Sequence, residues 1–130
     1  MARSTRVFSD LDFNFTAHPV TGDVARRYDE NAVKTAVKNL VLTANYERPF
    51  HSEIGSPVRA LLFEPPSPLL NVSLRRAIID LINNFEPRAE IIDVEVFDDI
   101  DNNSVAVTIT FKLVNTSTPI VLDVVLERTR

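Results

Sequence analysis

The spacing of apolar residues changes from strand-like to helical within the first third of the chain. Leu11, Phe13 and Phe15 alternate with polar residues, which is typical of a short strand with one buried face. From Asp29 onward the apolar residues share one helical face: Val33, Val37, Leu40, Val41 and Ala44. We therefore predict a short N-terminal strand and then a helix that Asp29 caps and that ends near Asn45.

The middle of the chain predicts two more helices. Ser56 is suited to cap a short helix and Pro57 to occupy its first position. Three prolines then stop it: Pro65, Pro66 and Pro68. A second long helix is expected after Ser73, with an apolar face of Leu74, Ala77, Ile78, Leu81, Ile82 and Phe85. Pro87 ends it, because proline disfavours a helical conformation in the preceding residue.

The last third of the chain predicts three strands. Val105–Leu113 has the clearest alternation, and Ile92–Phe97 and Ile120–Leu126 flank it. The links Asp98–Asn103 and Asn115–Pro119 are short and rich in turn-forming residues. The predicted class is α+β: two long helices and a short one packed on an antiparallel β-meander with a short N-terminal strand.

Composition limits the chemistry that this fold can carry. At 130 residues the chain fits a single domain, residues 1–130. It has no cysteine and only two glycines, which excludes thiolate metal sites, disulfides and a glycine-rich phosphate loop. A net charge of −4 disfavours nucleic-acid binding, and no apolar run approaches the length of about 20 residues that a membrane helix needs. We expect no cofactor, no nucleic acid and no membrane partner.

The charged residues gather unevenly near the C-terminal strands. Six acids and no base fall between residues 90 and 101: Glu90, Asp93, Glu95, Asp98, Asp99 and Asp101. This run is consistent with a solvated strand face and turn, and also with a surface that meets a basic partner.

Candidate catalytic and metal-binding groups are sparse. His51 and Glu53 could be two ligands, but a zinc site needs three or four and nothing supplies the rest. We expect His18 and His51 to form hydrogen bonds in loops. A glycosidase would need two carboxylates across a cleft, and the candidates are Glu47, Glu53, Glu64 and Glu86. A chain this short leaves little room for both a sheet core and a sugar cleft, so we predict no catalytic residue and no metal site.

Four segments in this order resemble one protein family: HPVTGD (His18–Asp23), the run from Asp29 to Ser56 that contains NLVLTANYERPF, LLFEPP (Leu61–Pro66) and FEPR (Phe85–Arg88). Jointly they resemble the small baseplate wedge proteins of contractile phage tails, a family that includes the TssE component of type VI secretion. The resemblance covers roughly residues 7–128. HPVTGD and ERPF favour a phage-type member.

The resemblance implies a structural role. Such proteins sit in the tail baseplate of the virion, are assembled in the host cytoplasm, and template the first sheath ring. The family's EPR motif, here Glu86, Pro87 and Arg88, contacts the helical bundle of larger wedge subunits. The residues alone favour a contact within the chain, between Glu86 and Arg88 or between an arginine and the helix end. The resemblance favours the partner instead. The alternatives are a TssE-like or other contractile-injection baseplate part, and a small cell-wall hydrolase.

The last predicted strand is a second candidate interface. A terminal strand commonly lies at a sheet edge, where unpaired backbone groups can accept a foreign strand. Sheath subunits of the family are interlocked by strand exchange, so the resemblance implies the tail sheath protein as the partner. The residues assigned to this contact are Ile120, Leu122, Val124 and Leu126. An edge kept monomeric by flanking charge remains the alternative.

Overall fold

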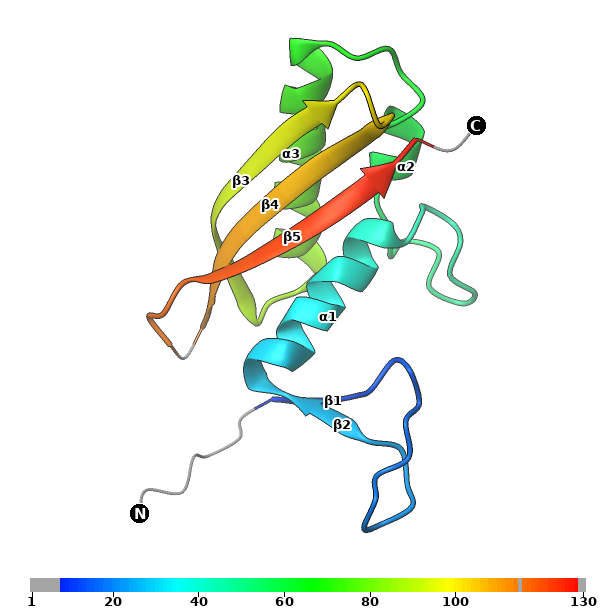
Figure 1. The fold of residues 1–130 in the computed structure, drawn as a ribbon, viewed down its shortest axis with the longest axis vertical. Coiled ribbons are helices and arrows are strands. Elements are labelled where there is room, and N and C mark those ends of the chain that lie inside the picture. Colours follow the sequence, from blue (N-terminus) through cyan, green and yellow to red (C-terminus); the bar gives the residue numbers. More distant parts are fainter. Residues whose placement is uncertain (1–7, 115, 129–130) are drawn as a thin grey trace.

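The computed structural model describes residues 8–114 and 116–128. In this part of the chain the elements follow one another as β1 (Ser9–Leu11), β2 (Arg26–Tyr28), α1 (Asp29–Leu42), α2 (Val58–Leu61), α3 (Pro68–Phe85), β3 (Ala89–Asp99), β4 (Ser104–Leu113) and β5 (Ile120–Glu127). Figure 1 shows α3 crossing one face of the sheet of β3, β4 and β5, with the β1–β2 ribbon beyond the start of α1.

The C-terminal sheet is an antiparallel meander in the order β3-β4-β5. One row across it consists of Phe97, Ala106 and Val125, which fixes the register of all three strands. A bulge between Ile91 and Asp93 turns Ile92 outward, so Ile92 leaves the apolar face that its spacing predicted. The predicted α+β class, with an antiparallel meander and three helices, is confirmed.

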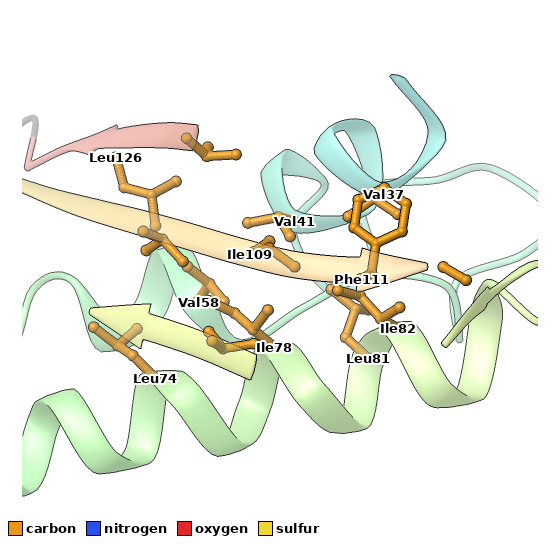
Figure 2. Close-up of a cluster of buried hydrophobic side chains, with 14 of the residues drawn as sticks. Val37, Val41, Val58, Leu74, Ile78, Leu81, Ile82, Ile109, Phe111 and Leu126 are labelled. Atoms are coloured by element: carbon orange, nitrogen blue, oxygen red, sulfur yellow. The ribbon is translucent and has the colours of Figure 1, made fainter. Parts of the chain in front are cut away.

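The core lies between this sheet and the helices (Figure 2). It is formed by inward side chains of β4, by one face of α3, and by smaller contributions from α1, α2, β3 and β5. Its labelled members are Val37, Val41, Val58, Leu74, Ile78, Leu81, Ile82, Ile109, Phe111 and Leu126. The alternation of β4 was the clearest in the sequence because its inward residues are all buried, as a central strand requires.

The start of α3 differs from the prediction. It was expected after Ser73, but α3 begins at Pro68. Ser67 is the N-cap, and its hydroxyl oxygen accepts a hydrogen bond from the Leu70 N–H at 3.1 Å. Proline suits the first helical position because its fixed φ is helical and the position needs no N–H donor. Pro68 therefore starts α3 instead of ending α2.

The boundaries of α1 also differ. Tyr28, not Asp29, is the N-cap, because Asp29 is tied to Phe8 instead. The Asp29 N–H donates to the Phe8 carbonyl oxygen at 2.8 Å, and the Phe8 N–H donates to the Asp29 carboxylate at 3.0 Å. The helix ends at Leu42, short of Asn45, since Thr43 is already extended.

Ser56 does not cap α2 as the sequence suggested. Its hydroxyl donates to the Val41 carbonyl oxygen at 3.0 Å, and Pro57 takes the cap position without a side-chain hydrogen bond. Ser56 is buried and thereby ties the start of α2 to the last turn of α1.

The N-terminal strand was predicted with the wrong face inward. Only Ser9–Leu11 forms β1, and Leu11, Phe13 and Phe15 are exposed. The buried residue of this segment is Asp12, whose carboxylate accepts a hydrogen bond from Arg27 Nε at 2.9 Å. A charged pair between two ribbon arms therefore replaces the expected apolar face.

Candidate docking surfaces

The corner between α3 and β3 places the three residues of the EPR motif in different environments. Glu86 is 5% exposed, Pro87 is exposed, and Arg88 is intermediate. The Glu86 N–H closes the last turn of α3 by donating to the Ile82 carbonyl oxygen at 2.9 Å. On the other side of the corner, the Arg88 carbonyl oxygen accepts from the Val114 N–H at 3.1 Å. The corner is thus fixed to α3 and to the end of β4, and it presents Pro87 outward.

The Arg88 guanidinium is held by its own chain. Its Nε and Nη2 atoms donate to the two carboxylate oxygens of Glu86 at 2.7 and 3.0 Å. Its Nη1 and Nη2 atoms donate to the two carboxylate oxygens of Asp10 at 3.0 and 3.1 Å. The contact between Glu86 and Arg88, which the sequence left open, is therefore present within the chain.

The charges of this corner cluster, defined as Asp10, Glu86 and Arg88, reinforce one another. Hydrogen bonds to Glu86 first, and to Asp10 second, raise the pKa of Arg88 above its ordinary value despite partial burial. The guanidinium also lies 5.7 Å from the centre of the Phe8 ring, within reach of a cation–π interaction. With two carboxylates and one guanidinium, the cluster carries a net negative charge.

A pocket of about 420 Å³ opens beside this cluster. Its walls combine residues of α1, the corner, and the loop between α1 and α2. They include Ala36, Leu40, Arg48, Ile54, Phe85 and Arg88. The ERPF and EPR segments, some forty residues apart in sequence, therefore line one cavity.

The second candidate surface is the outer edge of β5. Among the described residues, β5 pairs with β4 alone, so its other backbone edge has no strand partner. A groove of about 320 Å³ runs beside this edge, between α1, α2 and β5. It is lined by Val41, Leu42, Val58, Arg59, Leu62, Val125, Leu126 and Glu127. Such a groove next to an open strand edge can accept an extended segment by strand addition.

Of the four side chains predicted for this contact, only Leu126 lines the groove. Ile120, Val124 and Leu126 are buried in the core at 6, 3 and 4% exposure, and Leu122 packs partly buried against it. The outward side chains of β5 are instead Val121, Asp123, Val125 and Glu127. A partner at β5 would therefore meet backbone groups, two valines and two carboxylates.

Comparison with known families decides where this fold belongs. Residues 27–118 match the family described as baseplate wedge protein gp25. The chain belongs to this family. It is therefore a baseplate wedge protein of contractile tail systems. It is also 28% identical over 115 residues to baseplate wedge protein gp25 of Enterobacteria phage T4, covering 88% of this chain and 86% of that protein.

Solved structures share the fold of this wedge protein. The baseplate of the anti-feeding prophage contains a chain with a TM-score of 0.65 and 21% identity, covering 95% of this chain and 87% of that one. The postcontracted baseplate of pyocin R2 contains another, with a TM-score of 0.64 and 18% identity, covering 82% and 98%. A Geobacter sulfurreducens protein described as a "putative tail lysozyme" has a TM-score of 0.70 and 15% identity, covering 75% and 89%. At these identities the likeness concerns the fold.

Both histidines of the wedge protein act within their own loops. His18 Nδ1 accepts from the Val20 N–H at 3.2 Å, and His51 Nδ1 lies 3.2 Å from a Glu53 carboxylate oxygen. The backbone N–H of Glu53, and then His51, lower the pKa of Glu53. Over residues 8–114 and 116–128, no group of three or more His, Asp and Glu residues could hold a metal ion. Within the same ranges, no helix has the length and apolarity needed to cross a bilayer.

Sequence reasoning missed two residues of the corner. Asp10 gave no local signal, because its partner Arg88 is 78 positions away. Arg48 lay within the ERPF segment that carried the resemblance, but nothing in the sequence assigned it a contact. Only the fold brings both to the EPR corner.

Proposed function

We propose that this wedge protein joins two parts of the tail. Its α3–β3 corner docks on the larger wedge subunits, and the open edge of β5 accepts a strand of the tail sheath protein to start the first sheath ring. The observation that carries the proposal is the outer edge of β5, which has no strand partner among the described residues, with a groove beside it. The groove has apolar walls and also the charged residues Arg59 and Glu127. Membership of the wedge family supports the same role.

Docking at the corner depends more on the fixed shape of the Pro87 apex than on hydrogen bonds from the Arg88 guanidinium. Arg88 has five N–H donors, and four hydrogen bonds to Glu86 and Asp10 already occupy most of them. Pro87 is exposed at the apex, and it lacks an N–H and has a fixed φ, so the apex is stiff. A preformed, stiff surface lowers the entropy lost on binding.

The corner can be tested without disturbing the cluster. Pro87→Ala should weaken binding of the full chain to the larger wedge subunits several-fold while leaving thermal stability nearly unchanged. Pro19→Ala, in the exposed loop between β1 and β2, is the matched control and should bind normally. Equal affinities for the two variants would remove Pro87 from the docking surface.

The β5 edge can be tested with a pair of lysines. Val125 and Phe97 lie in the same row of the sheet, on its opposite edge strands, and are 62 and 58% exposed. Lysine on an edge strand hinders strand addition. Val125→Lys should yield baseplates that fail to start a sheath, whereas Phe97→Lys should yield sheathed tails in electron micrographs. Normal sheaths on the Val125→Lys baseplates would refute the strand-addition proposal. Deleting β5 is a poorer test, because three of its side chains belong to the core.

We further propose that the protein is not a cell-wall hydrolase. Both carboxylate oxygens of Glu86, the most buried glutamate considered for such a role, accept hydrogen bonds from Arg88. A carboxylate in this arrangement is poorly placed to donate a proton to a leaving group. Purified protein should leave peptidoglycan intact, and release of soluble fragments that is lost in Glu86→Gln would overturn this.

We propose a phage tail as the setting, with a related contractile injection system as the second candidate because the structural relatives come from a prophage and a pyocin. Electron microscopy of the particle that contains this protein distinguishes the two, since a phage carries a capsid on the tail.

A further inference from the structure

The loop between α1 and α2 carries a charged side chain that its own fold leaves without a close partner. Arg48 is exposed and lines the pocket beside the EPR corner. Its guanidinium forms no ion pair or hydrogen bond with any residue of the described ranges. Its charge acts on Glu53 only as a minor influence, behind the Glu53 N–H and His51, and Glu53 itself is engaged by His51.

Arg48 and Arg88 thus differ in what they can offer a partner. Arg88 uses four hydrogen bonds on Glu86 and Asp10, so a partner would have to displace one of them. The planar guanidinium of Arg48 has N–H donors that are not hydrogen-bonded within the described residues, and this geometry binds a carboxylate through two parallel hydrogen bonds. Arg48 is therefore the available cation of this pocket.

The loop that carries Arg48 is anchored at its base. The Glu47 carboxylate accepts from the Ala44 N–H at 2.9 Å, and the Ser56 N–H donates to the Thr43 carbonyl oxygen at 2.9 Å. These contacts close the loop just after α1 ends. An anchored loop restricts the backbone that carries Arg48 before binding, so less backbone entropy is lost when the side chain is engaged.

The remaining lining of the pocket restricts the kind of occupant. Ala36, Leu40, Ile54 and Phe85 provide apolar wall. Arg48 and Arg88 balance the charges of Asp10 and Glu86 in the lining, so the pocket has no excess positive charge for a multiply charged anion such as a phosphate. A protein segment with one carboxylate and an adjacent apolar side chain satisfies both the free guanidinium and the apolar wall.

We propose that Arg48 binds an aspartate or glutamate side chain of a larger wedge subunit, with the apolar flank of that segment against Leu40 and Phe85. This rests on the docking role proposed above for the same corner. It assigns the recognition charge to Arg48 and leaves Arg88 to hold the corner in shape.

Binding of the full chain to the larger wedge subunits of the same tail, measured by titration calorimetry, tests the proposal. Arg48→Ala should weaken binding roughly ten- to a hundredfold, as expected for the loss of a charge-assisted hydrogen-bonded pair, and Arg48→Glu should weaken it more. Thermal unfolding should be unchanged in both. The matched control is Arg76→Ala, an exposed arginine of α3 that does not line this pocket, and it should bind within twofold of the wild type.

A charge-reversal series identifies the partner group. One Asp→Arg or Glu→Arg replacement in the wedge subunits should restore binding of the Arg48→Glu chain. Wild-type binding together with undiminished binding of Arg48→Ala would overturn the role of Arg48 and leave docking intact. Failure of every single reversal to restore binding would overturn the carboxylate partner. Failure of the wild-type chain to bind would instead refute docking itself, and this proposal with it.

Discussion

Arg88 donates two parallel hydrogen bonds of 3.0 and 3.1 Å to Asp10, although 78 positions separate the two residues. Asp10 is the middle residue of β1, which among the described residues pairs only with β2. The pair therefore attaches the N-terminal ribbon to the α3–β3 corner. It also means that the EPR motif is shaped by a residue outside it.

Replacing Asp10 should loosen the ribbon more than it destabilises the whole fold. Asp10→Asn keeps the size of the side chain and removes the charge that Arg88 binds. The Asp10 side chain is 38% exposed, so we expect a loss of about 1 kcal/mol in the free energy of unfolding. Amide hydrogen exchange over residues 9–28 should accelerate. Asp101→Asn, at an exposed turn residue, is the control; equal exchange in the two variants would contradict the attachment.

Arg88→Ala should destabilise the protein, which affects every assembly experiment based on it. The change leaves the Glu86 carboxylate, only 6% exposed, with the Arg88 backbone N–H at 3.3 Å as its one remaining partner in this network. Removing one member of a buried pair typically costs about 3 kcal/mol. The double variant Glu86→Gln with Arg88→Ala should recover about 1 kcal/mol or more, because no buried charge is left. Chemical denaturation of the three proteins measures this, and a single variant as stable as the wild type would disprove it.

The parts of the fold that sequence could predict are those whose signal is local and repeated. The face of α3 and the alternation of β4 repeat over several turns or residue pairs, so β4 and the C-terminal part of α3 were predicted close to their observed places. The first turns of α3, from Pro68 to Ser73, were missed. The three-residue strands β1 and β2 are too short for a reliable period, and the buried residue beside β1 is Asp12, which forms an ion pair with the half-exposed Arg27 of β2. Spacing of apolar residues carries no information on such a pair.

In the candidate site, too, the features with a local sequence signal were predicted and those that depend on the fold were not. The motif and the last strand were located from sequence, because one is a short run of letters and the other an alternating segment. The direction of the side chains of the last strand was not predicted from sequence, because the burial of Ile120 and Val124 depends on which face of the sheet the helices cover. The Arg48 pocket arises only where loop, helix and corner meet.

Gly55 should be far less tolerant of substitution than Gly22. A Cβ at Gly55 would lie 2.5 Å from the Ala44 carbonyl oxygen, and backbone atoms cannot move aside as a flexible side chain can. We expect Gly55→Ala to cost about 1–3 kcal/mol and to weaken wedge binding, since it disturbs the loop that carries Arg48. At Gly22 no atom lies within 4 Å, and only its φ of +70° opposes alanine, at about 1 kcal/mol. Thermal and chemical unfolding compare the two, and equal losses would argue against the close contact.

Asp12 should make stability depend on pH in the acid range. The hydrogen bond from Arg27 holds the pKa of Asp12 below its ordinary value of 3.8, against the opposing effect of desolvation. A carboxyl whose pKa is lower in the folded state binds protons more tightly when unfolded, so it stabilises the fold above the ordinary pKa. That contribution is lost as the pH falls below 3.8 and through the lower, folded value.

The comparison of wild type with Asp12→Asn isolates this effect. The difference in unfolding free energy between them should be constant from neutral pH down to about 5 and should shrink below the ordinary pKa of an aspartate. Arg27→Gln should remove most of the same pH dependence, because it removes the main cause of the shift. Arg26→Gln, at an exposed position of β2, should retain it. A difference between wild type and Asp12→Asn that stays constant down to pH values well below 3.8 would show that Asp12 acts through packing and not through its charge.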